Sequence, residues 1–162
     1  MRVLGIDPSV RSTGYGVIES HGSVVRLIEA GIITTSARGQ TFTTRLGDIN
    51  DSLQAIIKAT RPDLVAIEEV FARAVNPKTT IMMAHARGAL LAAVAGAHLD
   101  VVEFSATSVK RALAGSGAAS KEQVARMVVQ ILRLARTPRP ADVTDALALA
   151  IACAHRNGRR VR

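Results

Sequence analysis

The sequence contains few aromatic residues and cysteines, which stabilise many small domains. Its 162 residues include no Trp, one Tyr, three Phe and one Cys. The lone Cys153 excludes an internal disulfide and a cysteine-rich zinc site. Because aromatic residues are scarce while hydrophobic residues make up 48% of the chain, the core must be built from aliphatic side chains. The chain is long enough for one domain with such a core.

Long hydrophobic runs are also absent. The best candidate for a membrane span, residues 88–99, is too short to cross a bilayer. Asp7 interrupts the only apolar stretch near the start, so we expect no signal peptide. The sequence therefore predicts a cytoplasmic protein with no membrane partner.

Acidic residues are scarce in one part of the chain only. Residues 1–103 contain ten Lys or Arg and ten Asp or Glu, whereas residues 104–162 contain eleven Lys or Arg and three Asp or Glu. The whole net charge of +8 therefore lies in the last third. Such an excess suggests a polyanionic partner, with nucleic acid first. A basic surface without such a partner is the alternative, and charge alone does not decide between them.

Short apolar segments and helical periodicities alternate along the chain. Segments bounded by turn residues predict strands over 2–7, 15–19, 24–33, 64–69 and 101–104. Apolar residues that recur at three and four predict helices over 46–61, 77–95, 105–113, 120–132 and 142–155. The first three strands form an antiparallel meander, with a turn-rich loop over 8–14. We expect an α/β fold, a mixed five-stranded sheet flanked by helices, in one domain over 1–157 with a basic tail at 158–162.

Carboxylates stand at the ends of three of these elements. Asp7 follows the first strand, and Glu68 and Glu69 follow the fourth. Neighbouring strand residues face opposite ways, so only one glutamate can share a site with Asp7, and the strand alone does not say which. Asp142 and Asp145, three residues apart, lie on one face of the last helix. Together these oxygens suit Mg²⁺ or Mn²⁺, two of which can promote phosphodiester cleavage.

Each acid also has a simpler interpretation. Asp142 and Asp145 are also typical of the first turn of any helix, where negative charges interact favourably with the helix dipole. Asp7 can begin an Asp-Pro turn, and the paired glutamates can end a strand in solvent. Their occurrence together, in a chain with a basic last third, favours a shared site.

Five segments, taken in order, closely resemble the RuvC family, the crossover junction endodeoxyribonucleases that resolve Holliday junctions. They are LGIDP (4–8), TGYGVI (13–18), AIEEVF (66–71), ARG (86–88) and ADVTDALA (141–148). The resemblance runs over nearly the whole chain and implies a ribonuclease-H-like fold. It also implies a homodimer, Mg²⁺-dependent nicking of four-way DNA junctions in recombination and repair, and RuvA and RuvB as a branch-migration partner.

The same resemblance implies the roles of individual acids. It places the catalytic and metal-binding residues at Asp7, Glu68, Asp142 and Asp145, and thus favours Glu68 over its neighbour. It implies two Mg²⁺ ions per subunit, for which Mn²⁺ can substitute. Some members carry His at the position of Asp145, so that role tolerates either ligand type.

Three further residues are candidates for contact with DNA. Lys110 and Lys121 match positions that the family uses to contact the DNA backbone, although a lone lysine is more often a solvated surface residue. Phe71 follows the Glu68 strand end, where a scarce aromatic ring could stack on an unpaired base. A place in the core is the commoner role of a Phe.

The helix over 77–95 carries the sequence's own indication of a dimer. Ala84, Gly88, Ala92 and Ala95 lie on or near one face, which would let another helix approach closely. The alternative is that this face packs on the protein's own sheet. A two-fold dimer suits a four-way junction because it presents two identical sites for two opposed nicks.

Two other functions remain open at this point. Gly5-Ile6-Asp7 with a following Thr-Gly pair also resembles the first phosphate motif of actin-like ATPases and sugar kinases. That nucleotide-binding fold needs two related domains and a second phosphate motif, which this chain does not supply. The other possibility is a non-catalytic DNA-binding protein, against which four intact acids argue.

Overall fold

The computed structural model describes residues 1–9, 12–22, 24–34, 40–69 and 77–158. The strands are β1 (Arg2–Asp7), β2 (Ser12–His21), β3 (Val24–Thr34), β4 (Leu64–Glu68) and β5 (Val101–Phe104). The helices are α1 (Phe42–Thr60), α2 (Pro77–Gly96), α3 (Ala106–Ala114), α4 (Lys121–Leu132) and α5 (Ala141–Gly158). Within the described ranges, no helix combines the length and the hydrophobicity needed to cross a lipid bilayer.

All five strands belong to one mixed sheet in the order β3-β2-β1-β4-β5. The first three strands pair antiparallel, and β4 and β5 run parallel to β1. The expected meander and the mixed five-stranded sheet are therefore confirmed. The expected loop over 8–14 is wrong at its end, because β2 begins at Ser12 and Gly14 pairs with Asp7.

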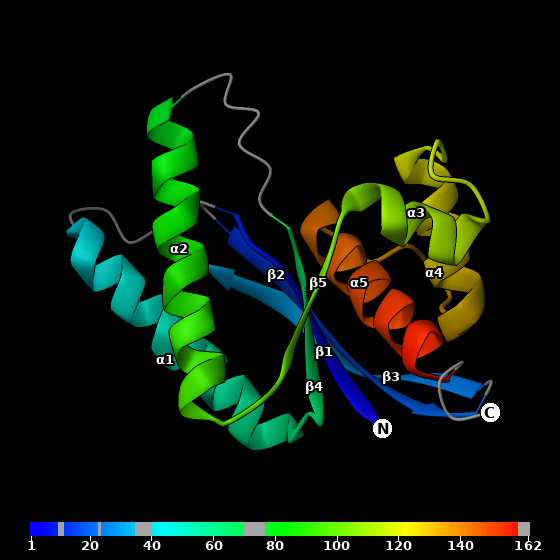
Figure 1. Ribbon diagram of the computed structural model, residues 1–162, viewed down its shortest axis with the longest axis horizontal. Coiled ribbons are helices and arrows are strands. Elements are labelled where there is room, and N and C mark those ends of the chain that lie inside the picture. Colours follow the sequence, from blue (N-terminus) through cyan, green and yellow to red (C-terminus); the bar gives the residue numbers. More distant parts are fainter. Residues whose placement is uncertain (10–11, 23, 35–39, 70–76, 159–162) are drawn as a thin grey trace.

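Helices cover both faces of the sheet, with α1 and α2 on one side and α3, α4 and α5 on the other (Figure 1). The alternation along β1 divides its side chains between the two layers. Leu4 and Ile6 join the core under α1 and α2, whereas Val3 joins the core under α5. Both cores are almost entirely aliphatic, as the shortage of aromatic residues requires.

Three glycines on neighbouring strands bring α5 unusually close to the sheet. A Cβ atom at Gly5 would overlap the carbonyl oxygen of Ala146, and one at Gly14 would overlap the carbonyl of Asp142. A Cβ atom at Gly16 would crowd the side chain of Leu147. The glycines thus hold the start of α5 against the ends of β1 and β2.

The ends of the helices follow their capping residues. Ser120 and Gln123 form the expected capping box at the start of α4, with distances of 3.2 and 2.7 Å. Gly115 ends α3 in the left-handed conformation with a φ of 75°. The last helix continues through Gly158, one residue into the expected tail, and residues 159–162 lie outside the described part of the chain.

Candidate active site

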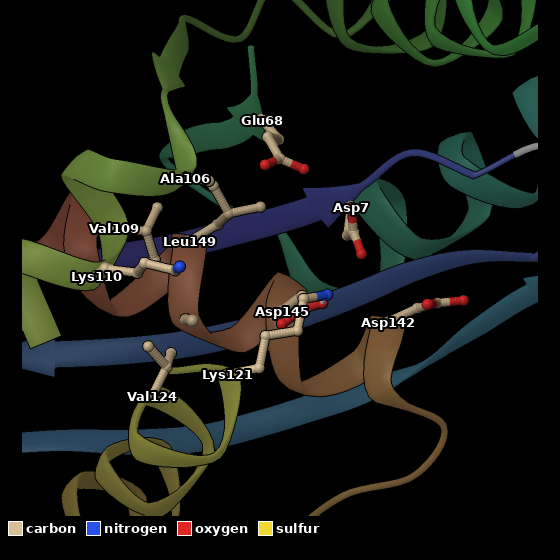
Figure 2. Close-up of a pocket in the computed structure, with 11 residues that line it drawn as sticks. Asp7, Glu68, Ala106, Val109, Lys110, Lys121, Val124, Asp142, Asp145 and Leu149 are labelled. Atoms are coloured by element: carbon tan, nitrogen blue, oxygen red, sulfur yellow. Dashed lines mark hydrogen bonds and ion pairs between the residues drawn. The ribbon is translucent and has the colours of Figure 1, made fainter. Parts of the chain in front are cut away.

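The four expected acids converge from three elements that are far apart in the sequence. Asp7 ends β1, Glu68 ends β4, and Asp142 and Asp145 lie in the first two turns of α5. Because β1 and β4 are paired and parallel, their carboxyl ends lie side by side. All four acids line one pocket of about 180 Å³, as Figure 2 shows.

The two glutamates at the end of β4 line different hollows. Val65 and Ile67 pack in the core under α1 and α2, whereas Ala66 packs in the core under α5. Glu68 has the same parity as Ala66, so its side chain faces α5 and the other acids. Glu69 lines a different groove, beside Phe104. Glu68 rather than Glu69 therefore shares a pocket with Asp7, a choice that the strand pattern alone leaves open.

Burial and mutual repulsion make this group of acids costly to hold as anions. The pKa of Asp7 is raised from 3.8 to about 7, chiefly by burial and then by the charges of Asp145, Glu68 and Asp142. Burial, followed by the charge of Asp145, also raises the pKa of Glu68. Lys121 opposes both shifts, because its positive charge favours the ionised carboxylates.

Two of the acids have hydrogen-bond donors from this chain. The Nζ atom of Lys121, at the start of α4, donates to Oδ2 of Asp145 over 3.1 Å. The Oγ atom of Ser12, at the start of β2, donates to Oδ2 of Asp142 over 2.7 Å. Among the described residues, no three acidic, His or Cys side chains surround a common point at which they could hold an ion.

The expected DNA-binding residues are only partly brought into the site. Lys110 extends from α3 toward the acids, and Lys121 extends from α4 (Figure 2). Val109, Val124 and Leu149 form an apolar part of the wall between these elements. Phe71 lies outside the described residues.

Ser12 is the site residue that sequence analysis missed. The sequence predicts a turn-rich loop at this position, whereas the contact of Ser12 with Asp142 depends on its place at the start of β2. The signal that could have found it is the alternation from Ser12 through Gly14 and Gly16, which continues the small-residue face of the strand.

Comparison with known proteins agrees with this arrangement. The sequence model of the family described as crossover junction endodeoxyribonuclease RuvC matches residues 3–155. A protein of that name from Bordetella avium is 46% identical over 155 residues, which are 96% of this chain and 84% of the relative. A second, from Chloroflexus aggregans, is 44% identical and is covered over 93% of its length.

Solved structures give the same result in three dimensions. The RuvC structure from Thermus thermophilus superposes with a TM-score of 0.88 at 36% identity, covering 97% of this chain and 95% of that one. A structure of T. thermophilus RuvC in complex with its Holliday junction substrate superposes equally well, at 32% identity. The expected ribonuclease-H-like fold is therefore confirmed, and the chain belongs to the RuvC family of crossover junction endodeoxyribonucleases.

Proposed function

We propose that the chain resolves Holliday junctions by cutting one phosphodiester bond in each of two opposed strands, with Asp7, Glu68, Asp142 and Asp145 as its catalytic acids. The observation that carries the proposal is the convergence of these four carboxylates in one pocket beside two lysines. Carboxylates alone repel a DNA phosphate, so such a pocket can bind DNA only when cations accompany the acids.

The donor set suits two Mg²⁺ ions per subunit, with Mn²⁺ as a substitute. The four acids supply only oxygen atoms, which hard divalent cations prefer. The raised pKa of Asp7 indicates a site in which a further positive charge would be favourable. Ser12 and Lys121 each occupy one oxygen of Asp142 and Asp145, so they compete with an ion for these carboxylates. When bound, such ions activate a water and stabilise the leaving oxygen in phosphodiester hydrolysis.

Lys121 is the counter-cation that the chain itself supplies to this site. Its pKa is raised by the hydrogen bond and the charge of Asp145, and further by the charges of Asp7 and Glu68. Its ammonium group therefore stays charged and can pass from Asp145 to a phosphate oxygen of the DNA. Lys110, which also lines the pocket, would bind a second phosphate oxygen. Phe71 completes the proposed DNA-binding set by stacking on an unpaired base.

A homodimer would place two such sites for the paired cuts. On α2, the buried face consists of Ala86, Arg87, Leu90, Ala93 and Val94. The small residues Ala84, Gly88, Ala92 and Ala95 are all exposed, so they do not pack on the chain's own sheet. Ile81, one turn before Ala84, is 57% exposed. An exposed face of small and apolar residues favours close approach of a second copy.

One alternative function and one proposed partner remain to be considered. The actin-like or sugar-kinase interpretation is not favoured, because the family match spans residues 3–155. A branch-migration complex of RuvA and RuvB remains a proposed partner, which co-sedimentation of the purified proteins on a synthetic junction would test. Failure of the three proteins to associate on the junction would contradict that partnership.

The proposed chemistry is tested with Asp7→Asn on a synthetic four-way junction and a matching duplex, each with and without Mg²⁺. Cleavage should fall at least about 100-fold, because an acid that holds or moves charge in the transition state is lost. Junction binding should be retained, because removal of a negative charge does not weaken contact with DNA. Asp51→Asn is the matched control, since Asp51 is an exposed carboxylate on α1. Cleavage by Asp7→Asn at the rate of the unaltered protein would contradict the assignment.

The same variant tests the dimer. Mixed dimers with one Asp7→Asn subunit are assayed on a junction held in a supercoiled plasmid. A dimer with one site per strand should leave single nicks in place of the paired cuts that linearise the plasmid. Full linearisation by the mixed dimer, or a monomer at working concentration in sedimentation, would refute the two-fold arrangement.

A further inference from the structure

A second groove continues from the active-site pocket along the loop between α4 and α5. It has a volume of about 360 Å³ and shares two residues, Lys121 and Asp145, with the pocket that holds the acids. Its far wall is the segment 137–141, which leads into α5. The two hollows therefore adjoin at the Lys121–Asp145 ion pair, and a strand bound at the acids can reach the groove by passing over that pair.

The loop that lines the groove is held in place by the helix that follows it. The Oγ1 atom of Thr144 donates to the carbonyl oxygen of Pro138 over 3.0 Å, and the backbone N–H of Val143 donates to the carbonyl of Pro140 over 3.1 Å. The two prolines have fixed φ angles and stand on either side of Arg139. Arg139 is thus presented from a constrained backbone, so little backbone entropy is lost when it binds.

The segment 123–141, which includes this loop, carries only positive charges. It contains Arg126, Arg133, Arg136 and Arg139 and no acidic residue. The last three are exposed, and within the described ranges none of them is paired with a carboxylate. Of the two acids in the groove, Asp145 is bound to Lys121, and the pKa of Glu122 is lowered by the Ser120 hydrogen bond and, to a lesser degree, by the charge of Arg126. Arg139 is therefore the cation of the groove that forms no ion pair within the described ranges, and Glu122 is the carboxylate that forms none.

We propose that this groove is a backbone-binding subsite for the strand that is cut, in which Arg139 holds a phosphate next to the scissile one. The proposal rests on the proposed nuclease function. A guanidinium group suits the contact because it can bind two phosphate oxygens at once. Arg136 and Arg133 continue the positive charge along the loop, away from the acids.

The first test is the salt dependence of junction binding, measured by fluorescence anisotropy in EDTA so that the substrate stays intact. Loss of one phosphate contact in Arg139→Gln should weaken binding and lower the slope of log affinity against log salt by about 0.9. Arg139→Lys should keep most of the slope, because it keeps the charge. Lys58→Gln is the matched control, since it removes one exposed positive charge from α1 on the other face of the sheet. If the slope of log affinity against log salt were the same for Arg139→Gln as for Lys58→Gln, the proposal would be overturned.

The second test locates the contact with junctions that carry one neutral methylphosphonate in place of a backbone phosphate. If Arg139 binds the phosphate beside the cut, the losses of binding free energy from neutralising that phosphate and from Arg139→Gln should not be additive. The losses from neutralising more distant phosphates and from Arg139→Gln should be additive. Additivity at every position beside the cut would overturn the assignment. Failure of the unaltered protein to prefer or cut the junction would instead contradict the proposed function, so the two failures are distinguishable.

Discussion

Gly5→Ala is the substitution that most directly tests how the site is assembled. A Cβ atom there would overlap the carbonyl oxygen of Ala146 and lie 2.8 Å from the backbone nitrogen of Ala150. Ordinary contact begins at 3.4 Å, so α5 must move at least 0.6 Å at Ala150 and further at Ala146. Neither obstacle is a flexible side chain, so the helix as a whole must move away from β1. We expect a shift on the order of 1 Å at the start of α5.

Two consequences follow from that shift. Overpacking of this kind should lower the free energy of unfolding by about 1–3 kcal/mol. Because Asp7 lies on β1 while Asp142 and Asp145 lie on α5, the shift also separates the acids, and a misplacement of about 1 Å can lower the rate about 100-fold. Urea unfolding and single-turnover cleavage of a synthetic junction measure the two effects.

Gly47→Ala is the control for Gly5→Ala. A Cβ atom at Gly47, inside α1, would meet nothing within 4 Å. That variant should therefore gain about 0.5–1 kcal/mol of stability from its better helix propensity and cut at the normal rate. If Gly5→Ala were as stable and as active as Gly47→Ala, the argument that glycine sets the approach of α5 to the sheet would be refuted.

Two further predictions concern a lysine and the lone cysteine. Lys121→Met should raise the affinity of the DNA-free protein for Mn²⁺ by about two- to fivefold, measured by calorimetry. The reason is that an exposed ion pair of about 0.5–1 kcal/mol no longer competes for Asp145. A lower affinity of the variant for Mn²⁺ would refute this competition. Burial raises the pKa of the Cys153 thiol to about 11, above its value in the unfolded chain, so its ionisation favours unfolding. Cys153 should resist a thiol reagent at pH 8 until urea unfolds the chain, and stability should fall between about pH 9 and 11 by an amount that Cys153→Ala removes. Rapid labelling of the native protein, or equal pH dependence in the variant, would contradict the burial argument.

Local patterns were sufficient for most of the fold. The helical spacing of apolar residues gave α1 and α5, and the Ser120–Gln123 pair marked the start of α4, because periodicity and capping depend on residues within one or two turns. The start of β2 at Ser12 is marked locally only by the small residues Ser12, Gly14 and Gly16, which also suit a turn. Its place in a strand depends on pairing with β1 and β3, which lie elsewhere in the sequence.

For the site, the sequence alone determined which residues could take part. Four acids at the ends of elements, two lysines and a basic last third are properties of the printed sequence. The tertiary structure decided three further points: that Glu68 rather than Glu69 shares a pocket with Asp7, that the small face of α2 is exposed, and that Lys121 reaches Asp145. Each depends on how two distant segments pack, through the pairing of β4 with β1, the docking of α2 and the spacing of α4 from α5. Spacing along the chain fixes which residues share a face, but only packing fixes what that face meets.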